Sequence, residues 1–404
     1  MENVFLSLFL LFVLFDNAIF NILSINGSGW TVIFTISLLM IFVIFMLFLP
    51  DRLKVTKLDL KVMILTTIII IVGLLGNYFF NYTNSIQFII TDVIDFIKFP
   101  FCFIAIRSLN IDRSLAKSFI NFGQYLVKIM IVIVFICGII SQFKDIGMTP
   151  NTRVWFGIHA YSFLFPHPTY FVLSCIFMLS LITSVNVKHL NIYVFILLIS
   201  TLLGLRTKGA VIVVVFIVLK YCKNFFRQHR FFSWLGVFFA TLIVGWSKLH
   251  EYLSYTGSAR EAAYVNAWDI LKKHFPIGSG FSTYASFLSG KAHSALYIDY
   301  PIPEGFDMYG LPTALLGDTG YPYYIAQFGI IGFLLFIVLL IDIYRILTQK
   351  KFALSSLVIF FYVVFALGSE SSLLNFGVET AVILATVNYI ENNYLVDDGV
   401  DKDE

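Results

Sequence analysis

Three basic residues in two separate segments have the setting of an anion-binding site. Arg206 and Lys208 belong to the segment GLRTKG (204–209) between two apolar runs, and Arg260 follows Ser258 at the start of a predicted helix. An arginine in the first helical turn opposes the helix dipole, so stability alone does not favour it there. Cations beside free helix N–H groups bind phosphate well. Together the three side chains would hold a pyrophosphate; the alternative is that each anchors a helix end by snorkelling.

Acidic and aromatic residues further along the chain are candidates for contact with a sugar. Asp318 lies just before an apolar run, and Tyr323 and Tyr324 open that run. Carboxylates and aromatic faces are natural carbohydrate contacts, and Asp318 would also serve as a general base for a hydroxyl. The alternative for the tyrosines is an aromatic belt at the membrane interface.

Two histidines extend this set of candidates. His167 lies between two prolines that hold it stiffly, so that it either contacts a substrate or caps a helix. His293 is a polar candidate in a long loop, where a solvated side chain is the alternative.

The composition excludes a soluble protein. Of 404 residues, 59% are hydrophobic and 13% are charged, and the mean hydropathy is +0.88. Too little polar surface remains to cover one soluble core, so a soluble enzyme, a disordered protein and a nucleic-acid binder are all poor interpretations. The four cysteines lie in or beside apolar runs without metal or disulfide spacing.

Apolar runs near the length of a bilayer predict transmembrane helices, because only helices and closed barrels satisfy the backbone in lipid. We therefore expect an all-α polytopic integral membrane protein with about twelve transmembrane helices and one long extracytoplasmic loop containing amphipathic helices. The predicted order is nine helices in 1–247, the loop at 248–319, three helices in 320–391 and an acidic tail at 392–404. The predicted spans are 3–25, 31–50, 62–80, 86–106, 119–141, 161–184, 190–205, 207–221, 231–247, 320–344, 353–369 and 373–391.

The placement of lysine and arginine predicts the orientation. Alternate loops hold fifteen basic residues, against four in the opposite short loops. By the positive-inside rule both termini lie in the cytoplasm, and the long loop lies outside the cytoplasmic membrane. The richer loops hold Arg52, Lys54, Lys57, Lys61, Arg107, Arg113, Lys117, Lys188, Lys220, Lys223, Arg227, Arg230, Arg345, Lys350 and Lys351.

The long loop opens with a predicted amphipathic helix on the membrane surface. Ser258 and Glu261 have the spacing of a capping box, so the helix begins at Ala259, and Pro276 stops it. Tyr264 shares a helix face with Arg260, which is predicted to bind phosphate, and Tyr264 is therefore a candidate substrate contact. That face carries Arg260, Tyr264, Ala267 and Leu271.

Charged residues inside apolar runs keep a transporter open as an alternative. Asp92, Asp95 and Lys98 recur at spacings of three in one predicted span. Ionisable groups in lipid face the bundle interior, where Asp95 and Lys98 would pair or take part in ion coupling. Further charges in such runs are Lys128, Asp342, Glu370 and Glu379.

The order of these motifs resembles one family of membrane enzymes. LRTKG (205–209) is followed by SAR (258–260), HFPIGSGF (274–281), Asp318 and FGIIG (328–332). Over about residues 200–335 this order resembles the bacterial O-antigen and capsular repeat-unit polymerases (the Wzy family) and the related O-antigen ligases.

The resemblance implies a metal-independent glycosyltransferase, without a cofactor, at the outer face of the cytoplasmic (inner) membrane. Such enzymes transfer a growing glycan from undecaprenyl pyrophosphate to another lipid-linked repeat unit. The family's essential arginines correspond to Arg206 and Arg260, with Lys208 as a helper. Ligases carry a histidine where this chain has Asp318, which favours a polymerase. A ligase and a lipid-linked oligosaccharide flippase remain the alternatives.

The partners implied are the lipid-linked oligosaccharide and membrane lipids, with a chain-length regulator and a flippase as candidates and no nucleic acid.

Overall fold

The computed structural model describes residues 2–25, 27–109, 113–150, 153–185, 189–221, 257–349 and 353–393. Several predictions fall outside these residues. They are the ninth span (231–247), the first part of the loop (248–256), most of the acidic tail (394–404), and Cys222, Lys188, Lys223, Arg227, Arg230, Lys350 and Lys351.

The protein is an all-α membrane protein. Five helices of the described ranges are long and apolar enough to cross a membrane. They are α1 (Glu2–Leu23), α2 (Ser28–Phe48), α3 (Lys57–Phe80), α5 (Arg113–Phe143) and α14 (Tyr321–Leu347).

Shorter elements complete the fold. The remaining helices of the bundle are α4 (Ile86–Ser108), α6 (Pro168–Thr183), α7 (Leu190–Leu203), α8 (Thr207–Tyr221), α15 (Leu354–Ala366), α16 (Ser372–Asn375) and α17 (Gly377–Asn393). The long loop contributes α11 (Ala259–Lys273), α12 (Phe287–Lys291), α13 (Leu296–Asp299) and the 3₁₀ turn η2 (Ala314–Gly317). A 3₁₀ turn η1 (Pro50–Arg52) and a hairpin of β1 (Val154–Trp155) and β2 (Ile158–His159) also occur.

Each predicted span in the described ranges overlaps a helix, but α3 and α5 begin five and six residues before their predicted starts, and two further spans differ more. Helix α6 begins at Pro168 rather than at residue 161. A proline fits the first helical turn, and His167 before it is extended and acts as the N-cap. The last predicted span, 373–391, is broken at Phe376 into α16 and α17. Hydropathy averages over such breaks, because the residues on both sides are equally apolar.

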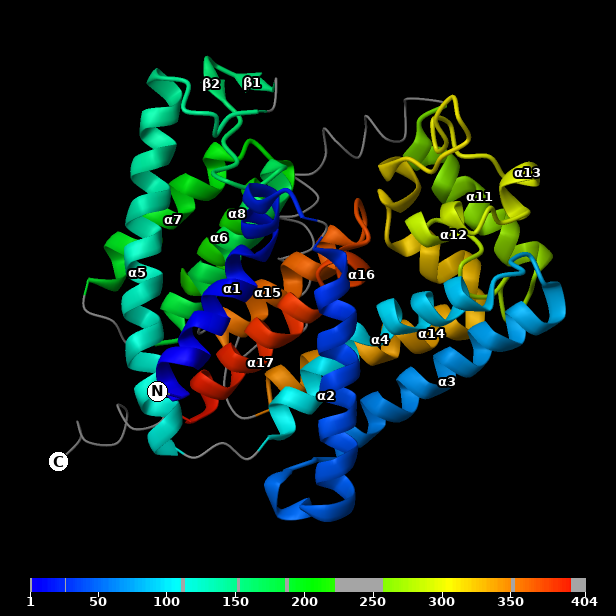
Figure 1. Cartoon of the computed structure of the whole chain (residues 1–404), viewed down its shortest axis with the longest axis horizontal. Coiled ribbons are helices and arrows are strands. Elements are labelled where there is room, and N and C mark those ends of the chain that lie inside the picture. Colours follow the sequence, from blue (N-terminus) through cyan, green and yellow to red (C-terminus); the bar gives the residue numbers. More distant parts are fainter. Residues whose placement is uncertain are drawn as a thin grey trace.

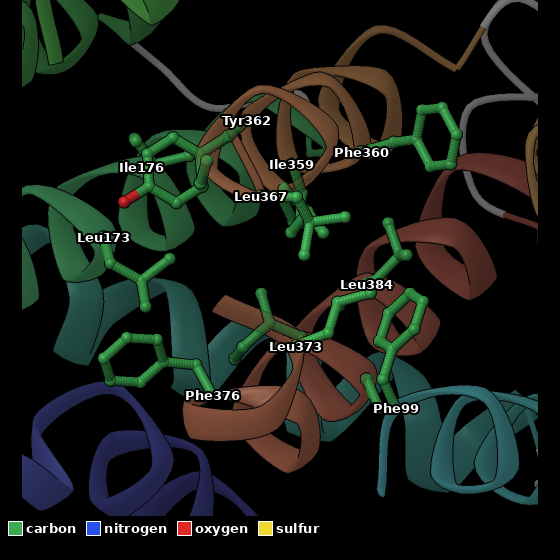
Figure 2. Packing of buried hydrophobic residues seen from close by; sticks show 14 of the residues in the cluster. Phe99, Leu173, Ile176, Ile359, Phe360, Tyr362, Leu367, Leu373, Phe376 and Leu384 are labelled. Atoms are coloured by element: carbon green, nitrogen blue, oxygen red, sulfur yellow. The ribbon is translucent and has the colours of Figure 1, made fainter. Parts of the chain in front are cut away.

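Two groups of helices share α4 (Figure 1). On one side α1, α5, α6, α7, α8, α15 and α17 form a bundle, and on the other α3 and α14 pack together beneath α11, α12 and α13. Helix α4 contacts α2, α3 and α17, and so joins the two groups. Figure 2 shows the core where α6, α15, α16 and α17 meet, with Leu173, Ile359, Leu373 and Phe376 directed into it.

Part of the long loop is buried among helices rather than solvated. The backbone of Phe281 forms two hydrogen bonds with the Asn77 side chain, to Oδ1 at 2.8 Å and from Nδ2 at 2.9 Å. The next N–H, of Ser282, donates to Asp92 at 2.6 Å. Gln327 of α14 donates to the carbonyl of Tyr284 at 2.6 Å. The loop segment 276–284 therefore docks between α3, α4 and α14; we call it the docked segment.

Glycines allow the docked segment to touch α14. Gly278 (φ 78°) and Gly329 (φ 60°) both adopt backbone conformations that other residues rarely take, and a Cβ on either would clash with the backbone of the other. Gly329 also interrupts the helical geometry of α14. The N–H of Gly280 is thereby able to donate to the carbonyl of Gln327 at 2.9 Å. These glycines thus serve packing in this structure.

We expect Asn77→Ala to destabilise the protein, because it leaves an N–H and a carbonyl of Phe281 buried without partners. The loss is about 2 kcal/mol or more, measurable as a lower thermal unfolding midpoint in detergent. Thr67→Ala, on an exposed face of the same helix, is the control and should change the midpoint little. Equal midpoints for the two variants would contradict the docking described here.

Candidate functional site

The three predicted cations lie close together in space, each beside a partner. We call Arg206, Lys208 and Arg260 the cationic cluster. Their contacts are Arg206 Nη2 to His167 Nε2 at 2.6 Å, Lys208 Nζ to Glu370 at 2.7 Å, and Arg260 Nη2 to Asp318 at 2.5 Å. Arg206 also lies within electrostatic reach of Arg260, Asp318 and Glu370, so the three pairs act on one another.

Helix α11 places Arg260. The Ser258 hydroxyl accepts a hydrogen bond from the N–H of Glu261 at 3.1 Å, so the predicted start at Ala259 is confirmed. The capping box is only half formed, because the Glu261 carboxylate accepts from Gly257 at 2.7 Å instead of from Ser258. The predicted stripe of the helix faces inward: Ala267 and Leu271 are buried and Arg260 is partly buried. That face packs on α14 and η2, next to Asp318.

Hydrogen bonds join two short segments, which carry the carboxylates of Asp318 and Glu370. The N–H groups of Gly320 and Tyr321 both donate to the carbonyl of Leu367, at 2.9 and 3.1 Å. Ser371 donates its N–H to Gly317 at 3.3 Å and its hydroxyl to the Thr319 carbonyl at 3.1 Å. Residues 317–321 and 367–371 are therefore fixed to each other, and with them Asp318 and Glu370.

Tyr264 belongs to this framework. Its hydroxyl donates to the carbonyl of Gly368 at 2.8 Å, two residues before Glu370. The hydrogen bond ties α11 to the segment that carries Glu370. Tyr264 therefore positions the site.

The turn between α7 and α8 places Arg206 and Lys208. Leu205 has a φ of 47°, which is uncommon for a residue with a side chain and turns the chain sharply. The N–H of Tyr161 donates to the carbonyl of Leu203 at 2.9 Å, so the turn lies against the segment that leads to His167. Arg206 keeps a buried Nε–H for which the described residues provide no acceptor. An anionic ligand that reached this donor would satisfy it.

The cluster is partly withdrawn from water and carries excess positive charge. The side chains of Lys208 and Glu370 are 16% and 12% exposed. Three cations against two carboxylates leave one net positive charge, and Arg153 acts on Arg206 as a further cation. A partly buried site strengthens charge–charge interactions, so it favours an anion of more than one negative charge.

The histidine of the site is neutral at neutral pH. Burial, and after it the charges of Arg206 and Lys208, together lower the pKa of His167 to about 4. The geometry agrees, because arginine has only donors and Nε2 must therefore accept. The neutral ring then carries its proton on Nδ1, so the 3.3 Å approach of the Thr169 N–H to Nδ1 is not a second hydrogen bond in this tautomer. His167 thus stands at the N-cap position of α6 and accepts from Arg206.

At Asp318, burial and the neighbouring cations shift the pKa in opposite directions. Burial raises the pKa of this carboxyl group, while Arg260, Lys208 and Arg206 oppose the rise. A carboxyl group with a raised pKa suits the role of proton acceptor.

Two predicted site residues lie elsewhere. Tyr323 and Tyr324 are 0% and 2% exposed, so they lie in the protein interior, and their contact with a sugar stays a prediction. The Tyr323 hydroxyl donates to Asp92 at 3.0 Å, and Tyr324 stacks on Phe336 with ring centroids 3.7 Å apart. Both belong to the packing of α14 on the docked segment.

His293 is exposed in the loop between α12 and α13. The contacts described for it do not join it to the cationic cluster, and its role in substrate binding stays a prediction.

Glu370 is the residue that sequence reasoning missed at the site. It was grouped only with charges inside apolar runs, although a lysine at the start of such a run calls for a counterion. That signal identifies the need for a partner but not which acid provides it, since the two residues are far apart in the chain.

The charged residues of α4 that the sequence analysis singled out have partners within the protein. Lys98 pairs with Asp95 at 2.5 Å, as the spacing predicted. Asp92 accepts from Ser282 of the docked segment and from Tyr323. These three residues therefore need no transported ion to explain them.

A scan against protein-family models found no match to this chain, and a search of curated proteins found none either. The geometry of the cationic cluster and the sequence motifs are therefore the guides to function.

We expect Arg206→Gln to raise the pKa of His167 from about 4 toward its ordinary value of about 6.5. The neutral side chain removes a positive charge that disfavours protonation of the ring. Because the native pKa is lowered, His167 contributes stability above its unfolded pKa that is lost as the pH falls toward 4. NMR of ¹³C-labelled histidine, assigned with His167→Gln, measures the shift. Lys272→Gln on exposed α11 surface is the control; a shift of equal size there would contradict the pairing.

Proposed function

We propose that the protein is an oligosaccharide repeat-unit polymerase. It transfers a glycan from undecaprenyl pyrophosphate to a lipid-linked repeat unit at the outer face of the cytoplasmic membrane. The observation that carries this proposal is the convergence of Arg206, Lys208 and Arg260, from separate segments, beside two carboxylates. The resemblance of the motifs to repeat-unit polymerases supports the same function.

The cationic cluster suits the leaving group of this reaction. Arginine forms paired hydrogen bonds with phosphate oxygens, and Lys208 adds a point charge. As the bond from the sugar to pyrophosphate breaks, negative charge builds on the leaving oxygen, and fixed cations stabilise it. Asp318 and Glu370 balance the cations while no anion is bound. The acceptor hydroxyl must lose a proton, and Asp318 is the proposed base.

The predicted topology of about twelve spans places this cluster on the outer face. The beginning of α1 and the end of α17 lie at the same end of the bundle in Figure 1, while the β1–β2 hairpin lies at the opposite end. The Tyr161–Leu203 hydrogen bond links the hairpin end to the turn that carries Arg206. The cluster thus lies at the end away from the beginning of α1, in agreement with cytoplasmic termini and an external site.

We expect Arg206→Ala and Arg260→Ala each to reduce polymer at least a hundredfold, on the scale of about 10²–10³ for one lost charge-stabilising donor. The measurement is glycan length on gels from cells lacking the gene and complemented with each variant. Single repeat units should remain attached to their acceptor. Lys272→Ala, exposed on α11 and paired only with Asp269 in the described contacts, should restore the full ladder.

The same gels separate the alternatives. Long polymer that accumulates on the lipid carrier without attachment would identify a ligase. A ladder unchanged by deletion of the gene would overturn the proposal.

A further inference from the structure

Two carboxyl groups lie against each other inside the bundle, apart from the ion pairs of the cationic cluster. Asp16 of α1 and Glu379 in the first turn of α17 are 4% and 3% exposed, and both line the same small cavity. Two ionised carboxylates at such close quarters would repel each other, so the arrangement favours one proton on the pair. Two uncompensated charges at this depth would be costly, which favours the shared proton.

The contacts indicate which group is ionised. Asp16 Oδ1 accepts from the N–H and the side-chain Nδ2 of Asn17, at 2.6 and 2.9 Å, and Oδ2 accepts from Trp30 Nε1 at 3.1 Å. Three N–H donors stabilise the carboxylate form. Glu379 is then the neutral acid of the pair.

The groups that face the pair come from each helix around it. Lys98 of α4 acts on Glu379 but is already paired with Asp95. The Cys102 thiol of α4 also lies within reach of the Glu379 charge. Trp30 of α2 and Tyr170 of α6 complete the polar surroundings.

A small cavity, large enough for about one water molecule, adjoins the pair. Asp16, Glu379, Tyr170 and Ser174 line its polar side. Glu379 Oε2 and Ser174 Oγ are buried and have no hydrogen-bond partner among the described residues. The apolar side includes Leu173 and Phe376, which lie near each other in Figure 2.

Tyr170 stands between the carboxyl pair and the cationic cluster. It lies within electrostatic reach of both Asp16 and Glu370. Its ring is 6.2 Å from that of His167, the partner of Arg206. Tyr170 therefore lies between the cavity that Asp16 and Glu379 line and the histidine that contacts Arg206.

We propose that Asp16 and Glu379 form a proton-binding site that takes up the proton released in the reaction, through Tyr170. This role rests on the proposed function. The acceptor oxygen bonds to the sugar carbon, the bond from that carbon to the pyrophosphate oxygen breaks, and pyrophosphate leaves with the electron pair. The hydroxyl proton passes to a carboxylate beside the cluster and then to Asp16, which leaves two neutral acids. The proton returns to water after pyrophosphate departs.

Infrared difference spectra between purified wild type and each variant test the shared proton without turnover. Wild type should show the C=O band of a protonated carboxylic acid, and Glu379→Gln should lose it. Glu391→Gln is the matched control on the same helix. Glu391 accepts from Ser355 N, Ser356 N and Ser356 Oγ at 2.8, 3.2 and 2.5 Å, so it is ionised and its replacement should leave the band intact. A band that persists in Glu379→Gln would overturn the site.

Turnover tests the role in the reaction. Asp16→Asn keeps the shape but removes the proton acceptor, so kcat should fall at least about tenfold while the KM for the lipid-linked donor is unchanged. Wild-type kcat in folded Asp16→Asn would overturn that role. If wild type itself transfers no glycan, the role falls with the proposed function, while the infrared result still decides whether the pair binds a proton.

Discussion

A buried stretch of backbone needs a partner for each of its N–H and C=O groups, and the docked segment finds them on three helices. Asn77 holds both backbone groups of Phe281, Asp92 accepts from Ser282, and the carbonyls of α14 accept from Gly280 and its neighbour. Helix α11 ends at Lys273, just before this anchor. The anchor therefore limits where Arg260 can lie, and the rest of the site is arranged around that position.

The second constraint is electrostatic. Each cation of the cluster is partly withdrawn from water, where an unpaired charge is expensive, and each has a nearby group that accepts its hydrogen bonds. Because the carboxylates are fixed by the interlocked segments 317–321 and 367–371, the cations are held in place before any ligand arrives. A pyrophosphate would meet donors that are already oriented, which is the condition for stabilising a leaving group without reorganisation.

The sequence predicts the helices well where their signal is local. Hydropathy locates α1, α2, α4 and α14 to within about three residues of their ends, and Ser258 is the N-cap that marks the start of α11 at Ala259. The sequence also predicts that Arg206 and Arg260 converge, because the positive-inside rule would place both segments on the same side of the membrane and a pyrophosphate would need several cations.

Other features depend on tertiary contacts that no local pattern contains. The tyrosines of α14 suit a sugar or a core equally well by composition, and only the docked segment decides that they are buried. Glu370 is distant from Lys208 in the chain, so their ion pair requires knowledge of how α8 and α15 pack. The break between α16 and α17 is hidden because both sides are apolar.

The most direct test of the central claim is the stoichiometry of transfer by the purified protein in lipid nanodiscs, supplied with lipid-linked repeat units alone. We expect one undecaprenyl pyrophosphate to be released for each repeat unit joined, with no other protein or nucleotide required. Glycan growth without release of undecaprenyl pyrophosphate, or release without growth, would contradict it.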